Sequence, residues 1–326
     1  MATFQHQSVL LSATLEAITP RDEEIYCDCT LGGGGHTEAL LRAAPGCRIV
    51  GMDRDLEALA AARERLAAWG DRVRFVHGAF GDACALLEAA GVPRVHGVIA
   101  DLGVSSWQLD APQRGFSFSK AGPLDMRMDP SRGRTALELM HALSAEELAN
   151  VIFELGEERH SRRIARAIKR ALDEDALATT TDLATLVARE IPAAEQRRSK
   201  IHAATRTFQA LRIAVNGELD QLAALLTAVP DLLHAGGRCA IISFHSLEDR
   251  MVKLRFRELC WSSSLPPALA AQEGERVAPV AELLTRKAAV ASDEEIAANP
   301  RARSARLRAL RRTEAPNLPA RTTPRR

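Results

Sequence analysis

The chain has no run of about 18 consecutive apolar residues, the length that a membrane-spanning helix needs. Its beginning also lacks a basic segment followed by a long apolar stretch, so we expect no secretory signal peptide. Net charge is nearly absent: 43 Lys and Arg residues against 42 Asp and Glu residues leave +1, which favours no class of partner. With 326 residues and 46% hydrophobic content, we expect a cytoplasmic globular protein of two domains, with no membrane as partner.

Cysteine is sparse and is not arranged for a metal or a redox pair. No C-x-x-C motif and no metal-ligand spacing of His or Cys occurs around the six cysteines, which are Cys27, Cys29, Cys47, Cys84, Cys239 and Cys260. Most of them lie in apolar runs, where a thiol behaves as a small buried hydrophobe, as suits a reducing cytoplasm. His245, Glu248 and Asp249 follow a later apolar run and have metal-binding chemistry, but we expect no metal there.

Apolar runs and helix-like stretches alternate in the first third of the chain. The apolar runs recur about every 24 residues, at 25–30, 48–53, 73–77 and 97–102. The stretches between them, at 36–44, 56–69 and 83–90, have helical patterns. Such alternation predicts βαβ units and a parallel sheet.

The alternation then stops. Residues from about 110 to 128 have the composition of an irregular loop, and a helical pattern runs from 135 to about 225. A strand pattern returns at 237–245, so one sheet is interrupted by a helical insertion and then completed. The predicted fold class is α/β, a parallel sheet with an inserted all-helical domain. We expect the sheet domain in two parts, 1–110 and 205–298, the insertion at 111–204, and a basic tail at 299–326.

Four glycines follow the first apolar run and precede a helical pattern. Glycine lets a ligand approach the main chain, and a helix start offers unpaired N–H groups. A dinucleotide fingerprint needs a third glycine where Thr37 or Glu38 stands, so an NAD site does not fit. The pattern acid-x-Thr-x-Gly-x-Gly-Gly, which begins at Asp28, fits enzymes that bind S-adenosylmethionine. A plain tight turn is the alternative.

Polar or aromatic side chains follow each of the next strands. Asp53 can accept the hydroxyl groups of a ribose, which both NAD and S-adenosylmethionine carry. Phe80 can pack on an adenine or belong to the core. After the fourth strand come Asp101, Ser105, Ser106 and Gln108. Ligands of parallel sheets bind at the carboxyl ends of strands, so cofactor and substrate are expected to meet there.

Basic residues gather in the helical insertion and at the end of the chain. Five arginines and one lysine surround an apolar stripe within 157–172, and Arg206, Phe208 and Arg212 share a second helix. These suit phosphate contact and base stacking, or an ordinary amphipathic helix. Residues 301–326 hold nine arginines and one acid, typical of a nucleic-acid-binding tail or of a solvated terminus.

Several motifs together resemble the bacterial MraW family, the ribosomal RNA small subunit methyltransferase H family. They run in order over nearly the whole chain, at residues 28–36, 52–55, 101–106, 114–118, 122–129, 156–159, 204–210, 243–250 and 299–308. The resemblance implies a Rossmann-like, S-adenosylmethionine-dependent methyltransferase with a helical insertion. It also implies methylation of the N4 amino group of a cytidine in the decoding region of 16S rRNA, in the small ribosomal subunit.

By the same resemblance, the expected cofactor contacts are Gly34, Gly35, His36, Asp53, Phe80, Asp101 and Gln108. We expect Asp101, Ser105 and Ser106 to position the base and accept its amino hydrogens. RNA phosphates are expected to bind Arg159, Arg163, Arg166, Arg206 and Arg212. Two rivals stay open at this point, an NAD-linked oxidoreductase and a non-catalytic binding protein that keeps the fold. The oligomeric state, a homodimer included, also stays open.

Overall fold

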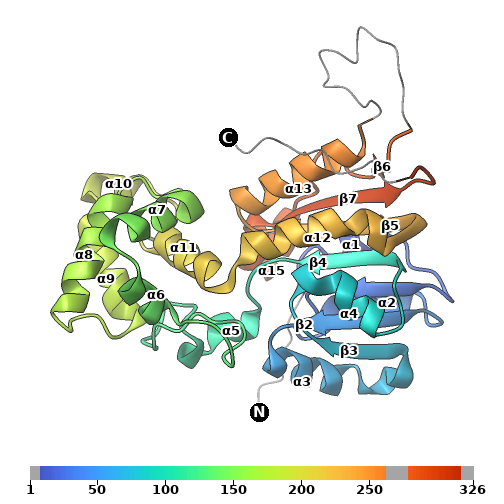
Figure 1. The fold of residues 1–326 in the computed structure, drawn as a ribbon, viewed down its shortest axis with the longest axis horizontal. Helices are drawn as coiled ribbons and strands as arrows, with labels where there is room; N and C mark the ends of the chain where they lie inside the picture. The colour runs from blue at the N-terminus through green and yellow to red at the C-terminus, as the bar shows by residue number, and fades with distance from the viewer. Residues whose placement is uncertain (1–7, 262–277, 317–326) are drawn as a thin grey trace, which may run out of the picture. The chain divides into compact units, whose positions relative to one another are not determined.

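The computed structural model describes residues 8–261 and 278–316 (Figure 1). The chain forms two compact units, which we call the sheet unit, Met1–Gly103 with Asp220–Arg326, and the helical unit, Val104–Leu219. The sequence had placed these divisions after residues 110 and 204. They fall elsewhere because Leu109 of α5 (Ser106–Asp110) and Phe208 of α11 (Thr205–Asn216) pack on the apolar core of the helical unit.

The sheet unit contains a seven-stranded sheet in the order β3-β2-β1-β4-β5-β7-β6. Its strands are β1 (Ile25–Asp28), β2 (Arg48–Asp53), β3 (Val73–His77), β4 (Val95–Asp101), β5 (Leu233–Ser243), β6 (Ala281–Leu283) and β7 (Arg306–Arg312). β1 to β5 pair in parallel, and β7 is antiparallel to both of its neighbours. The order reverses between β1 and β4, so the ligand crevice of a doubly wound fold is expected there. The predicted fold class is confirmed.

Successive residues of the strands face two different apolar clusters, as the pleat requires. Tyr26, Ile49 and Ile99 join one cluster, whose helices are α1 (Leu11–Ile18), α2 (Gly35–Ala43) and α3 (Leu56–Arg65). Cys27, next to Tyr26 in the chain, and Val98, next to Ile99, belong to the other cluster. The helices of that cluster are α4 (Ala83–Ala89), α12 (Glu218–Leu232) and α13 (Ser246–Leu259). Because both faces are covered, the central strands β1 and β4 are mainly apolar before the aspartate that ends each of them.

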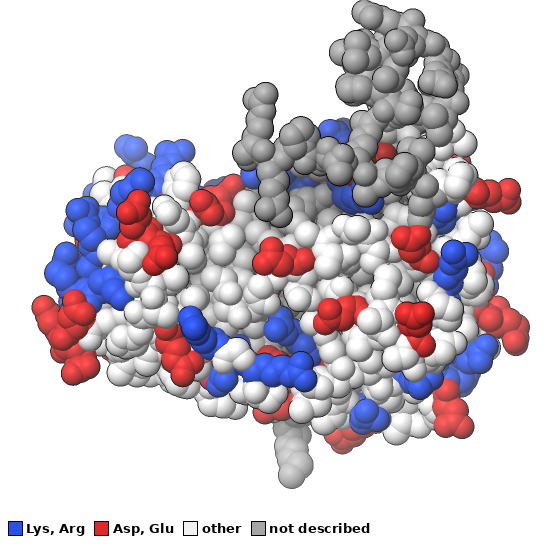
Figure 2. Space-filling view, viewed as in Figure 1, with Lys and Arg blue, Asp and Glu red and all other residues white. Residues whose placement is uncertain are grey.

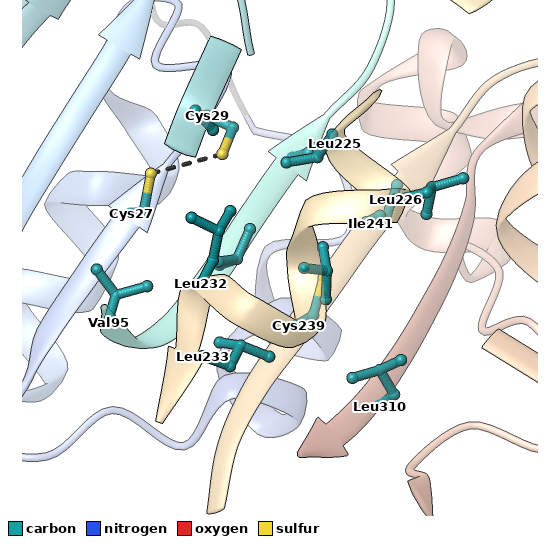
Figure 3. Packing of buried hydrophobic residues seen from close by; sticks show 14 of the residues in the cluster. Cys27, Cys29, Val95, Leu225, Leu226, Leu232, Leu233, Cys239, Ile241 and Leu310 are labelled. Atoms are coloured by element: carbon teal, nitrogen blue, oxygen red, sulfur yellow. Dashed lines mark hydrogen bonds between the residues drawn. The ribbon is translucent and has the colours of Figure 1, made fainter. Parts of the chain in front are cut away.

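Cysteines occupy the middle of the second cluster (Figure 3). Cys27 and Cys29 point toward each other from β1 and the turn after it, with their sulfur atoms 3.5 Å apart, beside leucines of α12. Burial raises the pKa of the Cys239 thiol, and a hydrogen bond with Cys29 followed by burial raises the pKa of Cys27. These thiols therefore stay protonated and serve as core side chains, as the sequence predicted.

The strand β7 corrects our expectation of a basic tail at 299–326. Leu307, Ala309 and Leu310 are buried between β5 and β6. The arginine side chains of the strand find partners: Arg308 donates to both carboxylate oxygens of Asp249 at 2.8 and 3.1 Å. The helix α15 (Asp293–Ala298) precedes this strand, and residues 317–326 lie outside the described part.

The helical unit has a core of its own, to which Met140, Leu148 and Ile164 belong. Besides α5 and α11, its helices are α6 (Ala136–Ala142), α7 (Ala145–Gly156), α8 (Ser161–Asp173), α9 (Thr180–Glu190) and α10 (Ala193–Arg198). Capping boxes begin α6, α7 and α9, which explains where these helices start.

The loop before α6 is irregular, as predicted, but it is tightly held. The buried guanidinium of Arg114 donates to the carbonyl oxygens of Arg127 and Met128 at 3.2 and 2.9 Å. Asn216 of α11 bonds to the same segment, to Met128 N and Met126 O, each at 2.8 Å. Side chains thus satisfy backbone groups that have no strand or helix partner.

Candidate functional site

Carboxyl groups end three adjacent strands of the sheet unit. Asp28, Asp53 and Asp101 are the last residues of β1, β2 and β4, and β1 pairs with both of the other strands. Burial is the main cause that raises the pKa of Asp28 and that of Asp53 to about 6. Burial, followed by repulsion from Asp28 and Glu248, raises the pKa of Asp101 well above its usual range. A cationic ligand would relieve this repulsion and favour the ionised forms.

The glycine loop between β1 and α2 offers its main chain to a ligand. Gly32 N donates to Asp53 Oδ2 at 2.8 Å, which fixes the loop against the end of β2. Gly34 has φ +80° at the start of α2, and a Cβ there would lie 2.9 Å from Leu66 Cδ1, so only glycine fits. A Cβ on Gly33 would meet nothing within 4 Å, so this side of the loop is open.

Two threonines hold the ends of β1 and β4. Thr37 Oγ1 donates to the buried Asp28 carboxylate at 2.7 Å, which fixes the start of α2 to the end of β1. Asp101 N donates to Thr30 Oγ1 at 2.6 Å. The sequence motif included Thr30 but not Thr37. Thr37 lies in the first turn of the helix, and that position was the available signal.

The two carboxylate oxygens of Asp101 have different surroundings. Oδ2 lies 3.9 Å from His36 Nδ1, whereas the buried Oδ1 accepts no hydrogen bond from any described residue. His36 Nε2 donates to Val9 O at 3.1 Å. The sheet unit therefore brings together five of the expected cofactor residues, Gly34, Gly35, His36, Asp53 and Asp101. A buried acceptor without a partner is costly, and a ligand donor at Oδ1 would remove that cost.

Phe80 begins the short 3-10 helix Phe80–Asp82, which follows β3. Its ring is partly buried and packs on the α12 side of the sheet. Gly81 N, next in the chain, donates to Gln221 Oε1 at 2.9 Å and holds this turn against α12. The ring therefore has a core role, and its contact with adenine stays a prediction.

Ser105, Ser106 and Gln108 belong to the helical unit, because the units divide after Gly103. Ser105 Oγ accepts from Gln108 N at 3.2 Å, and Gln108 Oε1 accepts from Ser105 N at 3.0 Å. This capping box starts α5 and gives both side chains a structural role. Their catalytic and cofactor roles stay predictions.

Four of the five arginines that we expected to bind RNA are exposed to solvent. Arg159, Arg163, Arg166 and Arg206 are exposed, and Arg163 pairs with Glu190 at 2.6 Å. Figure 2 shows basic side chains gathered where Figure 1 places α8 and α10. This is the distribution that phosphate binding needs.

Arg212 differs from the other arginines that we expected to bind RNA. Its Nε and Nη2 donate to the two carboxylate oxygens of Glu218, each at 2.9 Å. The two side chains are only 17% and 6% exposed. The pair joins the end of α11 to the start of α12, so the geometry gives Arg212 a structural role.

Residues 8–261 and 278–316 contain neither a metal-binding cluster of side chains nor a membrane-spanning helix. No group of three or more His, Cys, Asp and Glu side chains there is arranged to hold a metal ion. His245 is instead the N-cap of α13, 3.1 Å from Glu248 Oε1. In the same ranges, no helix has the length and apolar character to cross a bilayer.

Comparison with known proteins decides the family. The MraW methylase family matches residues 3–313. The chain belongs to this family. The similar MraW-family proteins include the "Ribosomal RNA small subunit methyltransferase H" of Sorangium cellulosum, 54% identical over 94% of this chain and 91% of that one. The protein of the same name from Syntrophotalea carbinolica is 52% identical over 95% of this chain and 98% of its own.

Among solved structures, an rRNA methylase from Streptococcus thermophilus is a distant match. It is 12% identical, with 96% of this chain and 100% of that one covered, at a TM-score of 0.39.

As a MraW-family methylase, the protein uses S-adenosylmethionine as its cofactor. The residues at the strand ends fit this ligand. It carries a sulfonium and an ammonium group, which buried carboxyl groups attract, and hydroxyl groups, which suit the acceptors Asp53 and Asp101. The open side of Gly33 leaves room for the ligand beside the main chain.

Proposed function

We propose that this protein methylates the N4 amino group of one cytidine in the decoding region of 16S rRNA, in the small ribosomal subunit, within the cytoplasm. The observation that carries the proposal is the identity of 52–54% with rRNA methyltransferases over 94–95% of the chain. The resemblance to the family over its motifs as a whole supplies the N4 atom and the cytidine.

Cofactor binding falls to the sheet unit in this proposal. Asp53 accepts N–H groups from Gly32 and Asp55 at 2.8 and 2.9 Å and has remaining lone pairs for two ribose hydroxyls. The main chain of Gly34 and Gly35 and the ring of His36 hold the amino-acid end of the cofactor. When bound, the cofactor supplies an electrophilic methyl group.

The residues from Asp101 to Gln108 position the base. The N4 lone pair of cytosine is delocalised into the ring, so an acceptor for the N4 hydrogens makes it more nucleophilic. Ser105 or Ser106 serves as that acceptor. As N4 gains a methyl group it must lose one proton, and the Asp101 carboxylate takes it before releasing it to water. Holding N4 about 3 Å from the methyl carbon, in line, contributes several kcal/mol.

RNA binding falls to the helical unit. Arg159, Arg163, Arg166 and Arg206 contact phosphates, while the target base leaves its stack at a cost of a few kcal/mol. Arg212 contributes indirectly, through its ion pair with Glu218. Light scattering of the protein, with and without RNA, tests whether it forms a homodimer.

The test is labelling of small ribosomal subunits with tritiated S-adenosylmethionine. Subunits from a strain that lacks the enzyme are incubated with wild-type protein, and the RNA is digested to nucleosides. We expect label in N4-methylcytidine from one decoding-region fragment, and a much lower initial rate of labelling with the Asp101→Asn variant. Label in a ring-carbon-methylated base, or in many fragments, would overturn the proposal.

A further inference from the structure

We propose that Glu295 is a positioning residue for the cofactor site, acting through the segment Ser8–Leu10 on His36. The inference rests on the proposed cofactor role of His36. It assigns a function to a residue that lies 259 positions away from His36 in the sequence, in the helix α15.

The segment Ser8–Leu10 precedes α1 and is buried, with its residues only 3–7% exposed. Leu10 has φ +51°, an uncommon conformation for a leucine, so something must hold it. Leu10 N donates to Glu295 Oε1 at 2.6 Å. Ser292 Oγ caps α15 by accepting from Glu295 N at 3.2 Å, which fixes the helical turn that presents the carboxylate.

The same segment touches the start of α2 at two points. Val9 O accepts the hydrogen of His36 Nε2 at 3.1 Å. A Cβ on Gly35 would collide with Ser8 Oγ, so the segment lies directly on the main chain of the glycine loop. The anchor at Leu10 therefore sets the position of two backbone segments, one of which carries His36.

The contact with Val9 also fixes the histidine ring. A carbonyl oxygen only accepts, so Nε2 carries a hydrogen and Nδ1 is the atom directed at Asp101 Oδ2, 3.9 Å away. A partner on one ring nitrogen is a common means of orienting a functional histidine. The chain of contacts thus runs from Glu295 through Leu10, Val9 and His36 to Asp101.

A purely structural role for Glu295 makes a different prediction. Its carboxylate also lies at the N-terminus of α1, where a negative charge stabilises a helix. If that were its whole contribution, Glu295→Ala would lower the thermal stability and leave cofactor affinity unchanged. Positioning requires a loss of affinity that depends on His36.

The test is a double-mutant cycle on S-adenosylmethionine affinity, measured by calorimetry on the full chain. We expect Glu295→Ala to weaken binding about fivefold, and to add nothing further in a His36→Ala background. Glu295→Gln keeps the Oε1 acceptor and should recover most of the affinity. The control is Asp293→Ala, an exposed acid in the same helical turn, which should leave affinity unchanged.

Equal effects of Glu295→Ala in both backgrounds, or unchanged affinity in the wild-type background, would overturn the inference. The assay contains no RNA, so its outcome is separate from that of the rRNA labelling. Wild-type protein that binds the cofactor but labels no rRNA would refute the proposed function and leave this inference standing. A His36→Ala variant with wild-type affinity would refute the inference together with the proposed cofactor role of His36, and would leave the proposed rRNA methylation standing.

Discussion

In the sheet unit, acidic side chains end β1, β2 and β4: Thr37 donates to Asp28, which is buried, and Gly32 N donates to Asp53, which is partly buried. In the helical unit, the buried positions of α8 are apolar apart from Ser161, and the arginines of this helix face solvent. Charge is thus kept at least partly inside at these strand ends, at the expense of stability, and left outside on α8 at little cost. We infer that substitutions in the sheet unit act on chemistry, and that single surface arginines act weakly and additively.

The largest effect is expected for Asp101→Asn. The amide keeps the shape of the side chain but cannot take the proton from N4 or attract the cationic cofactor. We expect kcat/KM to fall roughly 10²- to 10³-fold, a size typical of a lost general base. Steady-state methylation rates over a range of substrate concentrations measure this ratio. Wild-type turnover would remove Asp101 from the mechanism.

Next in size is Arg212→Ala, which tests whether an arginine of the helical unit can be structural. Removal of one partner leaves the buried Glu218 carboxylate uncompensated, at a cost of about 3 kcal/mol in unfolding free energy. Denaturant unfolding measures the loss. Arg166→Ala is the matched control, because its exposed side chain should change stability by less than about 0.5 kcal/mol.

A pH effect of intermediate size follows from Asp28 and Asp53. Their pKa values of about 6 exceed the usual value of about 3.9, so the folded protein retains protons between pH 4 and 6 that the unfolded chain has released. The unliganded protein should therefore lose stability as pH rises through this window. Cofactor affinity should change in the opposite direction, about tenfold tighter at pH 7 than at pH 5.

Calorimetry and thermal unfolding between pH 4 and 7.5 measure both trends. Asp28→Asn should flatten the stability trend, since its amide oxygen still accepts from Thr37 but has no proton to exchange. Affinity that is independent of pH would show that these groups stay ionised in the free protein.

The smallest effect is expected for the exposed arginines. Arg166→Ala should weaken RNA binding a few-fold and lower the slope of log K against log salt by about 0.7–0.9, the value for one phosphate contact. Cofactor affinity should be unchanged. Filter binding at several salt concentrations gives the slope. An unchanged slope would place the RNA on another surface.

The sheet was predictable because strands and helices alternate at a regular pitch, and the four parallel strands β1 to β4 lie where the apolar runs are. β7 was not, because the arginines of 306–312 gave it the composition of a tail. Its alternation of Arg306, Leu307, Arg308 and Ala309 is the period of a strand, and that was the missed signal.

The acids of the site were predictable because each one ends a strand pattern. The contact between Leu10 and Glu295 was not, since 285 residues separate them and nothing local pairs them. Arg212 was misleading for a similar reason. Its acceptor, Glu218, lies beyond a helix end, so spacing alone could not distinguish an ion pair from an RNA contact.

The central claim is that the glycine loop and the carboxyl groups of Asp53 and Asp101 hold one cationic ligand. A crystal structure with S-adenosylmethionine tests it most directly. We predict the ribose on Asp53, the main chain of Gly33 against the ligand, and a ligand donor at Asp101 Oδ1. Density for the cofactor at any other place, with these groups facing water, would contradict the account.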